Sequence, residues 1–252
     1  MTDRAPPQSD PFARFRAVTP ARIGLGRAGD ALPTDALLDF QAAHAAARDA
    51  VHGCVDFDAL AARLAPLPAL AVRSQAESRE VYLRRPDLGR RLCPDDVQRL
   101  AAQRSDWDLA IVVADGLSAR AVEHQAVPLL EALLPKLTGW RLAPIVLAAQ
   151  ARVAIGDAIA VHLGATMVAV LIGERPGLSV ADSLGVYLTW APAPGCPDSR
   201  RNCISNIHAH GLSHAGAAET LLWLMNRARR IRASGVALKL ERAAQGSLPG
   251  AS

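Results

Sequence analysis

The feature that most constrains this chain is a pattern, repeated from Asp108 onward, of a short apolar run followed by a helical stretch. In DLAIVVADGLSARAVEHQAVPLLEALLPKL, an apolar run and an Asp-Gly turn precede an amphipathic helix. The pattern recurs in LAPIVLA with RVAIGDAIAVHLG, and in TMVAVLIGERPGL with SVADSLG, before a last run, VYLTWAP. Strands that alternate with helices form parallel sheets covered on both faces. The sequence therefore predicts an α/β fold with a Rossmann-like, doubly wound, mostly parallel sheet.

Composition and periodicity divide the chain into three regions. Residues 1–18 are rich in Pro, Asp and Arg and predict a flexible tail. Residues 19–105 predict an N-terminal helical region, in which TDALLDFQAAHAAARDAV has apolar residues at helical spacing. Residues 106–252 contain the predicted sheet and a final helix, AGAAETLLWLMNRARRIRASG, that we expect to end at Gly235. The inward residues of these two helices are expected to be Leu37, Leu38, Phe40 and Ala43, and Leu221, Leu222, Met225 and Ala228.

The stretch GLGRAG, residues 24–29, has the G-x-G-x-x-G spacing of a dinucleotide-binding loop. Such a loop must follow a central strand, but AVTPARI is too short and contains a proline. The acidic residue expected about 20 residues later would also fall inside a helix. We therefore interpret GLGRAG as a close-packing turn.

Charge and cysteine content exclude several classes of protein. The net charge of +4 is mild and lacks interleaved aromatic residues, which argues against a nucleic-acid partner and leaves an anionic ligand open. The four cysteines show no C-x-x-C spacing, and MTDRAPPQSDPF lacks the apolar run of a signal peptide. No apolar window approaches the ~20 residues of a membrane span. We expect a cytoplasmic protein in a reducing compartment.

Open α/β sheets bind ligands at the carboxyl ends of their strands, and three predicted loops lie there. They are residues 115–118, residues 173–177 and residues 200–206. The loop GERPG offers a carboxylate and a guanidinium between glycines, although Glu174 and Arg175 could equally form surface ion pairs. Ser118 lacks the G-x-S-x-G elbow of a hydrolase, and no Asp and His in the sequence complete a convincing catalytic triad with it.

Two further arrangements remain open. His208, His210 and His214 could be drawn with Cys203 as a zinc site, but the loop NIHAHGLSHAG is more simply a polar connection that caps the final helix. Cys203 could be a reactive thiolate beside Arg201, although a buried or ligand-packing thiol is commoner. The residues thus predict a ligand-binding α/β domain without its own catalytic machinery, as expected of a subunit that presents a cofactor to chemistry located elsewhere.

Several longer strings carry a resemblance to a known family. TPARIGLGRAG, YLRRPDLGRRL, VVADGLSARAV, RVAIGD, LIGERPGLSVADSLGVYLTW and RNCISNIH occur in this order between Thr19 and Lys239. Together they resemble the small subunit of ethanolamine ammonia-lyase. GLGRAG is then expected to shape the chain or to contact the large subunit. YLRRPDLGRRL could be a surface loop with intramolecular ion pairs or a docking element, and its density of Arg residues favours docking.

The resemblance implies a carbon–nitrogen (ammonia) lyase that uses adenosylcobalamin to convert ethanolamine to acetaldehyde and ammonia. It places the substrate site and the catalytic residues on a TIM-barrel large subunit, present in equal number and contacted by residues 19–105. It also implies that Val153, Glu174 and Cys203 bind the corrinoid where the two subunits meet, with no metal ligands on this chain.

The resemblance also bears on the state and location of the cofactor. The chain lacks the D-x-H-x-x-G string that supplies a histidine to cobalt, so the cofactor is expected to be base-on. Such enzymes are cytoplasmic and can be packed in a bacterial microcompartment. Two other readings stay open: a non-catalytic corrinoid- or nucleotide-binding module, and an independent Rossmann-type oxidoreductase.

Overall fold

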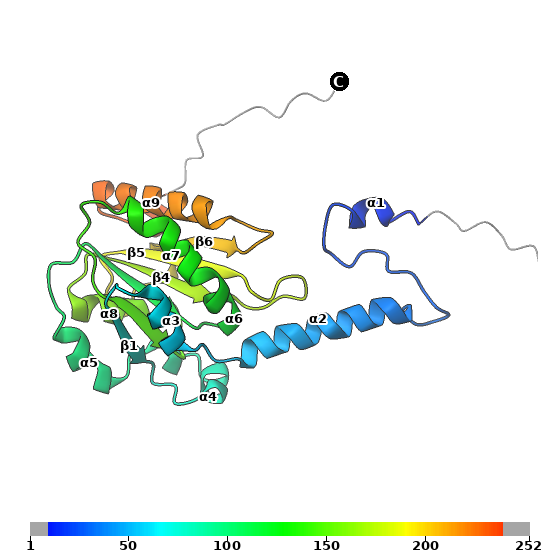
Figure 1. Ribbon diagram of the computed structural model, residues 1–252, viewed down its shortest axis with the longest axis horizontal. Coiled ribbons are helices and arrows are strands. Elements are labelled where there is room, and N and C mark those ends of the chain that lie inside the picture. The colour runs from blue at the N-terminus through cyan, green and yellow to red at the C-terminus, as the bar shows by residue number, and fades with distance from the viewer. Residues whose placement is uncertain (1–9, 239–252) are drawn as a thin grey trace, which may run out of the picture.

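The computed structural model describes residues 10–238, which form an α/β fold around one six-stranded sheet (Figure 1). The strands are β1 (Ala69–Arg73), β2 (Leu109–Ala114), β3 (Ile145–Ala149), β4 (Met167–Gly173), β5 (Leu184–Trp190) and β6 (Arg201–Ile207). The helices are α1 (Ala13–Arg16), α2 (Thr34–His52), α3 (Phe57–Leu64), α4 (Arg79–Arg84), α5 (Pro94–Ala101), α6 (Ala119–Ala121), α7 (Val127–Leu133), α8 (Ile155–Leu163) and α9 (His214–Ile231). Parts of two expected regions, residues 1–9 and 239–252, lie outside the described residues.

The sheet is mixed, with the strand order β1-β3-β2-β4-β5-β6. The first four strands in this order are parallel, whereas β5 is antiparallel to both β4 and β6. The prediction of a helix in SVADSLG, with a parallel strand after it, is therefore wrong. Parallel neighbours need a crossover of about a dozen residues, usually helical, and the short segment from Glu174 to Ser183 holds no helix.

Two further segments differ from expectation. The segment expected as a loop at 200–206 is mostly strand β6, which pairs with β5 through Tyr187 and Cys203. The region 19–105 is also not purely helical, because β1 joins the sheet beside β3. Its sequence, ALAVR, is too short and too close to Pro66 and Pro68 to be distinguished from a loop by periodicity.

Helices cover both faces of the sheet, and each face has its own apolar core. One core joins α3, α7 and α9 to side chains such as Leu171 and Val186. The other joins α5 and α8 to the opposite side chains of the same strands, such as Val170. The expected inward residues Leu221, Met225 and Ala228 of α9 are buried, and Leu222 packs at the edge of its core. Helix α9 ends at Ile231, before Gly235, with Arg232 in a left-handed conformation at its C-cap.

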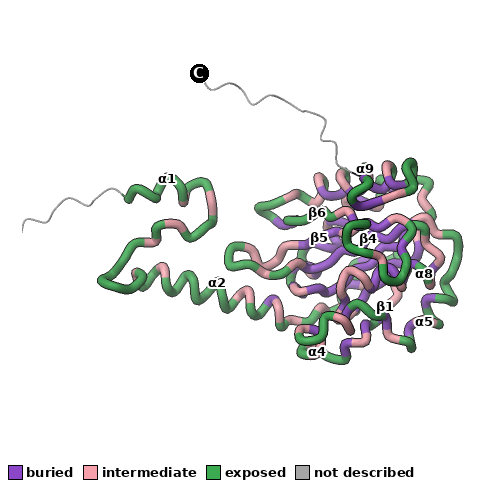
Figure 2. The backbone as a smooth tube through the Cα atoms, turned by 180° about the vertical axis from the view of Figure 1, so that it is seen from behind, coloured by how far each residue is buried: buried purple, intermediate pink, exposed green. Residues whose placement is uncertain are grey.

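Helix α2 extends away from the sheet and is mostly exposed (Figures 1 and 2). Its helical conformation was predicted, but the expected inward residues Leu37, Leu38 and Phe40 are exposed, and of its residues only Ala50 is buried. The preceding stretch GLGRAG lies between α1 and α2 with Gly24, Gly26 and Gly29 at positive φ. It follows no strand of residues 10–238, as expected for a turn rather than a dinucleotide loop.

Candidate functional site

Glu174 directly follows β4 and joins three neighbouring segments at the carboxyl end of this strand. Its backbone N–H donates to the Ser183 carbonyl (2.9 Å), and its Oε2 accepts from the Ser183 hydroxyl (2.5 Å) and from the backbone N–H of Asn206 (3.2 Å). Gly185 makes room for the carboxylate, since a Cβ there would lie 3.0 Å from Oε1. Within residues 10–238, Oε1 accepts no side-chain or backbone hydrogen bond, so it can receive an N–H from a ligand.

Cys203 lies in the middle of β6, next to Tyr187 of β5; the residue as a whole is exposed, whereas its sulfur is partly desolvated by its neighbours. Burial of the sulfur raises the pKa of the Cys203 thiol, a hydrogen bond with Tyr187 opposes that rise, and the Glu174 charge adds to it. Burial also raises the pKa of the Tyr187 phenol. Both groups are therefore neutral at pH 7, which argues against the expectation that Cys203 could be a reactive thiolate beside Arg201.

Val153 lies in the segment that connects β3 to α8 and packs at the edge of the core beneath α8. The start of this connection is held by the buried carboxylate of Asp115, which accepts from the backbone N–H groups of Gln150 (2.8 Å) and Ala151 (2.9 Å). The Tyr82 hydroxyl donates to the Ala151 carbonyl at 3.1 Å. A strand end, a loop and α4 thus fix the backbone next to Val153.

The motif YLRRPDLGRRL takes part in this arrangement. Besides the Tyr82 contact, its Gly89 carbonyl accepts from the backbone N–H of Arg152 at 2.8 Å. A Cβ at Gly89 would lie 3.0 Å from both the Tyr82 ring and the Arg152 side chain, so only glycine fits without displacement. Arg85 and Asp87 of the same motif form an exposed ion pair at 2.8 Å. The motif therefore has an intramolecular role, positioning the connection that contains Val153.

Glu174, Cys203 and Val153 all lie on or beside the face of the sheet that α8 covers. Val170, Tyr187 and Cys203 are register partners across β4, β5 and β6. Gly156 of α8 packs directly on Val170, where a Cβ would lie 2.5 Å from Cγ2. Exposure increases along this row, from buried Val170 through half-buried Tyr187 to exposed Cys203, although α8 still reaches β6 through Asp157. The exposed part of this face thus carries Cys203, and Glu174 lies beside it at the end of β4.

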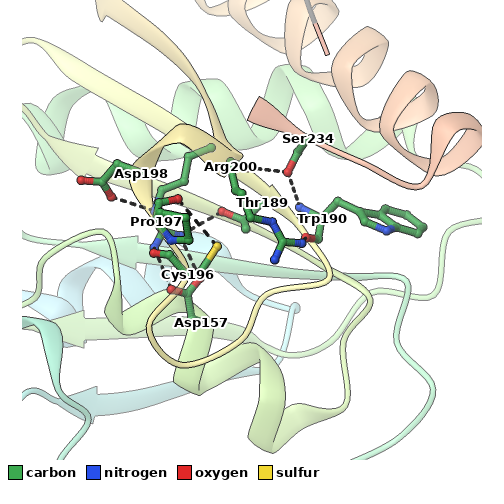
Figure 3. A network of polar contacts seen from close by, with 9 residues as sticks. Asp157, Thr189, Trp190, Cys196, Pro197, Asp198, Arg200 and Ser234 are labelled. Carbon is green, nitrogen blue, oxygen red and sulfur yellow. Dashed lines mark hydrogen bonds and ion pairs between the residues drawn. The ribbon is translucent and has the colours of Figure 1, made fainter. Parts of the chain in front are cut away.

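A network of polar contacts links α8, β5 and the loop before β6 (Figure 3). Arg201 donates to both carboxylate oxygens of Asp157 on α8 (2.8 and 2.7 Å) and to the Thr189 hydroxyl (3.0 Å). Arg201 also donates to the Cys196 carbonyl and to Asp198, which fixes the loop before β6. The pairing of Arg201 with Asp157 was not foreseen, because the two residues are 44 positions apart in the sequence. The signal in the sequence was an Asp in the first turn of a mostly apolar helix.

Other candidate residues have structural partners instead. Ser118 is buried and caps α6, accepting from the Ala121 N–H and donating to the Ala181 carbonyl. The loop before α9 was predicted to cap it, and Ser213 does so by accepting from the Gly216 N–H. The imidazoles of His208 and His214 lie against Asn206 and Gln125, each at 2.8 Å.

Three properties limit the chemistry available to the described part of the chain. No group of three or more His, Cys, Asp or Glu side chains within residues 10–238 is arranged to hold a metal ion. None of the helices in this range combines the length and the apolar character needed to cross a bilayer. Glu174, Cys203 and Tyr187 form a surface of hydrogen-bonding and small apolar groups rather than an acid–base pair. The fold and the site thus define a class of protein: an α/β domain with a candidate ligand surface at the carboxyl ends of its parallel strands.

Comparison with known proteins gives the family. A family model described as "Ethanolamine ammonia-lyase light chain" matches residues 9–239. A relative from Azotobacter vinelandii (strain DJ / ATCC BAA-1303), "Ethanolamine ammonia-lyase small subunit", is 54% identical over 96% of this chain and 92% of its own. Those of the same description from Pseudomonas syringae pv. tomato and Pseudomonas aeruginosa (strain LESB58) are 52% and 51% identical, each over 96% of this chain and over 86% and 92% of their own lengths. The chain belongs to the ethanolamine ammonia-lyase light-chain family, and so to a lyase of which it is the small subunit.

Proposed function

We propose that this chain helps to hold adenosylcobalamin in ethanolamine ammonia-lyase, at the interface with a TIM-barrel large subunit. In this proposal the enzyme converts ethanolamine to acetaldehyde and ammonia, and the groups that act on the substrate belong to the large subunit. Val153, Glu174 and Cys203 are the proposed corrinoid contacts. The observation that carries the proposal is that Glu174 is fixed through Oε2 while Oε1 is left without a partner among residues 10–238.

The residues at this edge fit a corrinoid. The rim of a corrin ring carries carboxamide groups, which can donate N–H to the free Oε1 of Glu174. Val153 offers half-buried apolar surface, and Cys203 offers a small neutral side chain on the uncovered part of the sheet. The raised pKa of the Cys203 thiol keeps a second negative charge away from Glu174. The described residues suit orientation and desolvation of a ring edge more than proton transfer.

Adenosylcobalamin, when bound, supplies radical chemistry, and this chain's share is to bind and orient it and to exclude water. The sequence contains no D-x-H-x-x-G string that could supply a histidine to cobalt. We therefore propose that the cofactor is base-on. We further propose equal numbers of the two subunits, docking of residues 19–105 on the large subunit, and a cytoplasmic enzyme that can be encapsulated. The parallel part of the sheet is proposed to be related to Rossmann-like doubly wound folds.

The test is co-expression of this chain with the large subunit, followed by assay of acetaldehyde release over a range of adenosylcobalamin concentrations. Glu174→Ala should raise the half-saturating cofactor concentration by about tenfold or more, since charge-assisted hydrogen bonds contribute about 1.5–3 kcal/mol. Glu131→Gln, at an exposed position of α7, is the matched control and should leave it unchanged. Activity that needs neither this chain nor the cofactor would refute the proposal.

A second candidate is a corrinoid- or nucleotide-binding module without a lyase partner. It would bind adenosylcobalamin tightly as an isolated chain. The lyase subunit should bind it well only with the large subunit present, so equilibrium dialysis of the chain alone and of the complex separates the two.

A further inference from the structure

A hollow lies at the same edge of the sheet as the candidate ligand surface, between α2 and the loop after β4. It encloses about 520 Å³ and is lined by residues of α2, of the connection before α8, and of the loop after β4. Five of the lining residues are basic and none is acidic: His44, Arg48, His52, Arg152 and Arg175. We call it the basic pocket. Its lining gives it a positive potential, which favours an anionic ligand.

The guanidinium groups of the basic pocket have no polar partner within residues 10–238. Among residues 10–238, the side chains of Arg48, Arg152 and Arg175 form no hydrogen bond and no ion pair, whereas Arg85, Arg99 and Arg201 each pair with a carboxylate. Nε of Arg152 is buried without an acceptor in the described part of the chain. A buried, unpaired donor on a cation is costly, so an acceptor from outside the chain is expected.

The position of Arg152 is prepared by its neighbours. Its guanidinium carbon lies 4.4 Å from the centre of the Tyr82 ring, and that of Arg79 lies 4.8 Å from the same centre. Arg79 in turn donates to the carbonyls of Val51 (2.7 Å) and Gly116 (2.8 Å), linking α2 to the end of β2. Arg152 is therefore held by stacking on the Tyr82 ring and by its backbone hydrogen bond to Gly89. Neither contact uses the N–H donors of its guanidinium group.

The basic pocket adjoins the proposed corrinoid contacts along the chain. Arg152 precedes Val153, and Arg175 follows Glu174. Planar guanidinium groups bind phosphate oxygens in pairs, with charge-assisted hydrogen bonds. The only anionic group of adenosylcobalamin is the phosphodiester of its nucleotide tail.

From the unpaired guanidiniums of Arg152 and Arg175 in an acid-free pocket, we infer that the basic pocket binds a phosphate group. Resting on the proposed function, this inference assigns the group to the nucleotide tail of the corrinoid. A free phosphate ion has the same chemistry, and the experiment must distinguish the two sources.

The experiment measures binding by equilibrium dialysis, read from corrinoid absorbance, for the complex of this chain with the large subunit. Two ligands are compared, adenosylcobinamide phosphate and adenosylcobinamide, which differ by the phosphate. Arg175→Gln and Arg152→Gln should each raise the dissociation constant of the first by about tenfold or more and change that of the second less than twofold. Arg230→Gln, exposed on α9, is the charge-matched control and should change neither.

The exposed Arg175 side chain forms no hydrogen bond or ion pair within residues 10–238, so Arg175→Gln keeps the test valid even if Arg152→Gln weakens the fold. Equal weakening of both ligands, or no weakening of either, would overturn the inference. If the unaltered complex bound neither corrinoid, nor adenosylcobalamin itself, the proposed function would fail separately. Binding of inorganic phosphate to the basic pocket would then be measured by phosphorus NMR. Loss of phosphate binding in Arg175→Gln would support the inference, and unchanged binding in this variant would refute it.

Discussion

Arg201 of β6 and Asp157 of α8 form a two-point ion pair in the interior, with both side chains 2% exposed. The hydrogen bonds with Asp157 raise the pKa of the Arg201 guanidinium, which therefore stays charged in the interior. It joins the helix that follows Val153 to the strand that carries Cys203. This buried pair thus links the elements beside two of the three proposed corrinoid contacts, Val153 and Cys203.

Removing either member of this pair should destabilise the protein strongly. Arg201→Met and Asp157→Leu should each lower the free energy of unfolding by about 3–5 kcal/mol, because each leaves an uncompensated buried charge. The double variant, Arg201→Met with Asp157→Leu, should lose less than the sum of the two. Urea unfolding followed by circular dichroism measures this, and additive losses would contradict the coupling.

Gly116 should tolerate no side chain. Its φ is +60°, and a Cβ there would lie 2.3 Å from the Gly173 carbonyl oxygen, where β2 and β4 end side by side. Gly116→Ala should cost about 2–5 kcal/mol through backbone strain and overpacking. Gly139→Ala is the matched control, since its φ is +80° but nothing lies within 4 Å of its Cβ position. It should cost only about 1–2 kcal/mol, and similar losses in thermal unfolding for both would count against the packing argument.

The Cys203 thiol should be alkylated slowly at pH 7 despite its exposure. Burial of its sulfur raises its pKa above the ordinary value of 9.0, and only the thiolate reacts. The rate with iodoacetamide should therefore rise with pH until above pH 9. Tyr187→Phe removes a hydrogen bond that lowers the pKa and should move this rise to higher pH, whereas Glu174→Gln should move it lower.

Peptide-resolved mass spectrometry follows the reaction of Cys203, with the exposed Cys54 as an internal comparison. Shifts in the same direction for both variants would show that the assigned causes are wrong. In the complex with the large subunit, adenosylcobalamin should protect Cys203 if the proposed contact exists.

Tyr82 is expected to affect both stability and cofactor binding. Tyr82→Phe keeps the ring beneath Arg152 but leaves the carbonyl of the buried Ala151 without its donor. The free energy of unfolding should fall by about 1–3 kcal/mol. Tyr82→Leu also removes the ring and should weaken corrinoid binding further than Tyr82→Phe does. If the two variants bound the cofactor with equal affinity, the Tyr82 ring would have no role in positioning Arg152.

Local pattern was sufficient for much of the fold. The apolar runs identify β2, β3 and β4, because a strand buried on both faces reads as a continuous apolar segment. Helical spacing and the terminal glycine identify α8, which ends with Gly164 at a φ of +78°. The strings around Val153, Glu174 and Cys203 carry the family, and 54% identity to one relative agrees with it.

Tertiary structure decided the direction of β5, the existence of β1 and β6 as strands, and the exposure of Leu37, Leu38 and Phe40. It also decided which side chains meet, since Asp157 finds Arg201 and Gly89 finds Arg152 only after the sheet has formed. The physical reason is that hydrophobic period and caps depend on neighbours along the chain. Strand pairing and buried polar contacts depend on segments that are distant in sequence, so they are determined only when the whole core is packed.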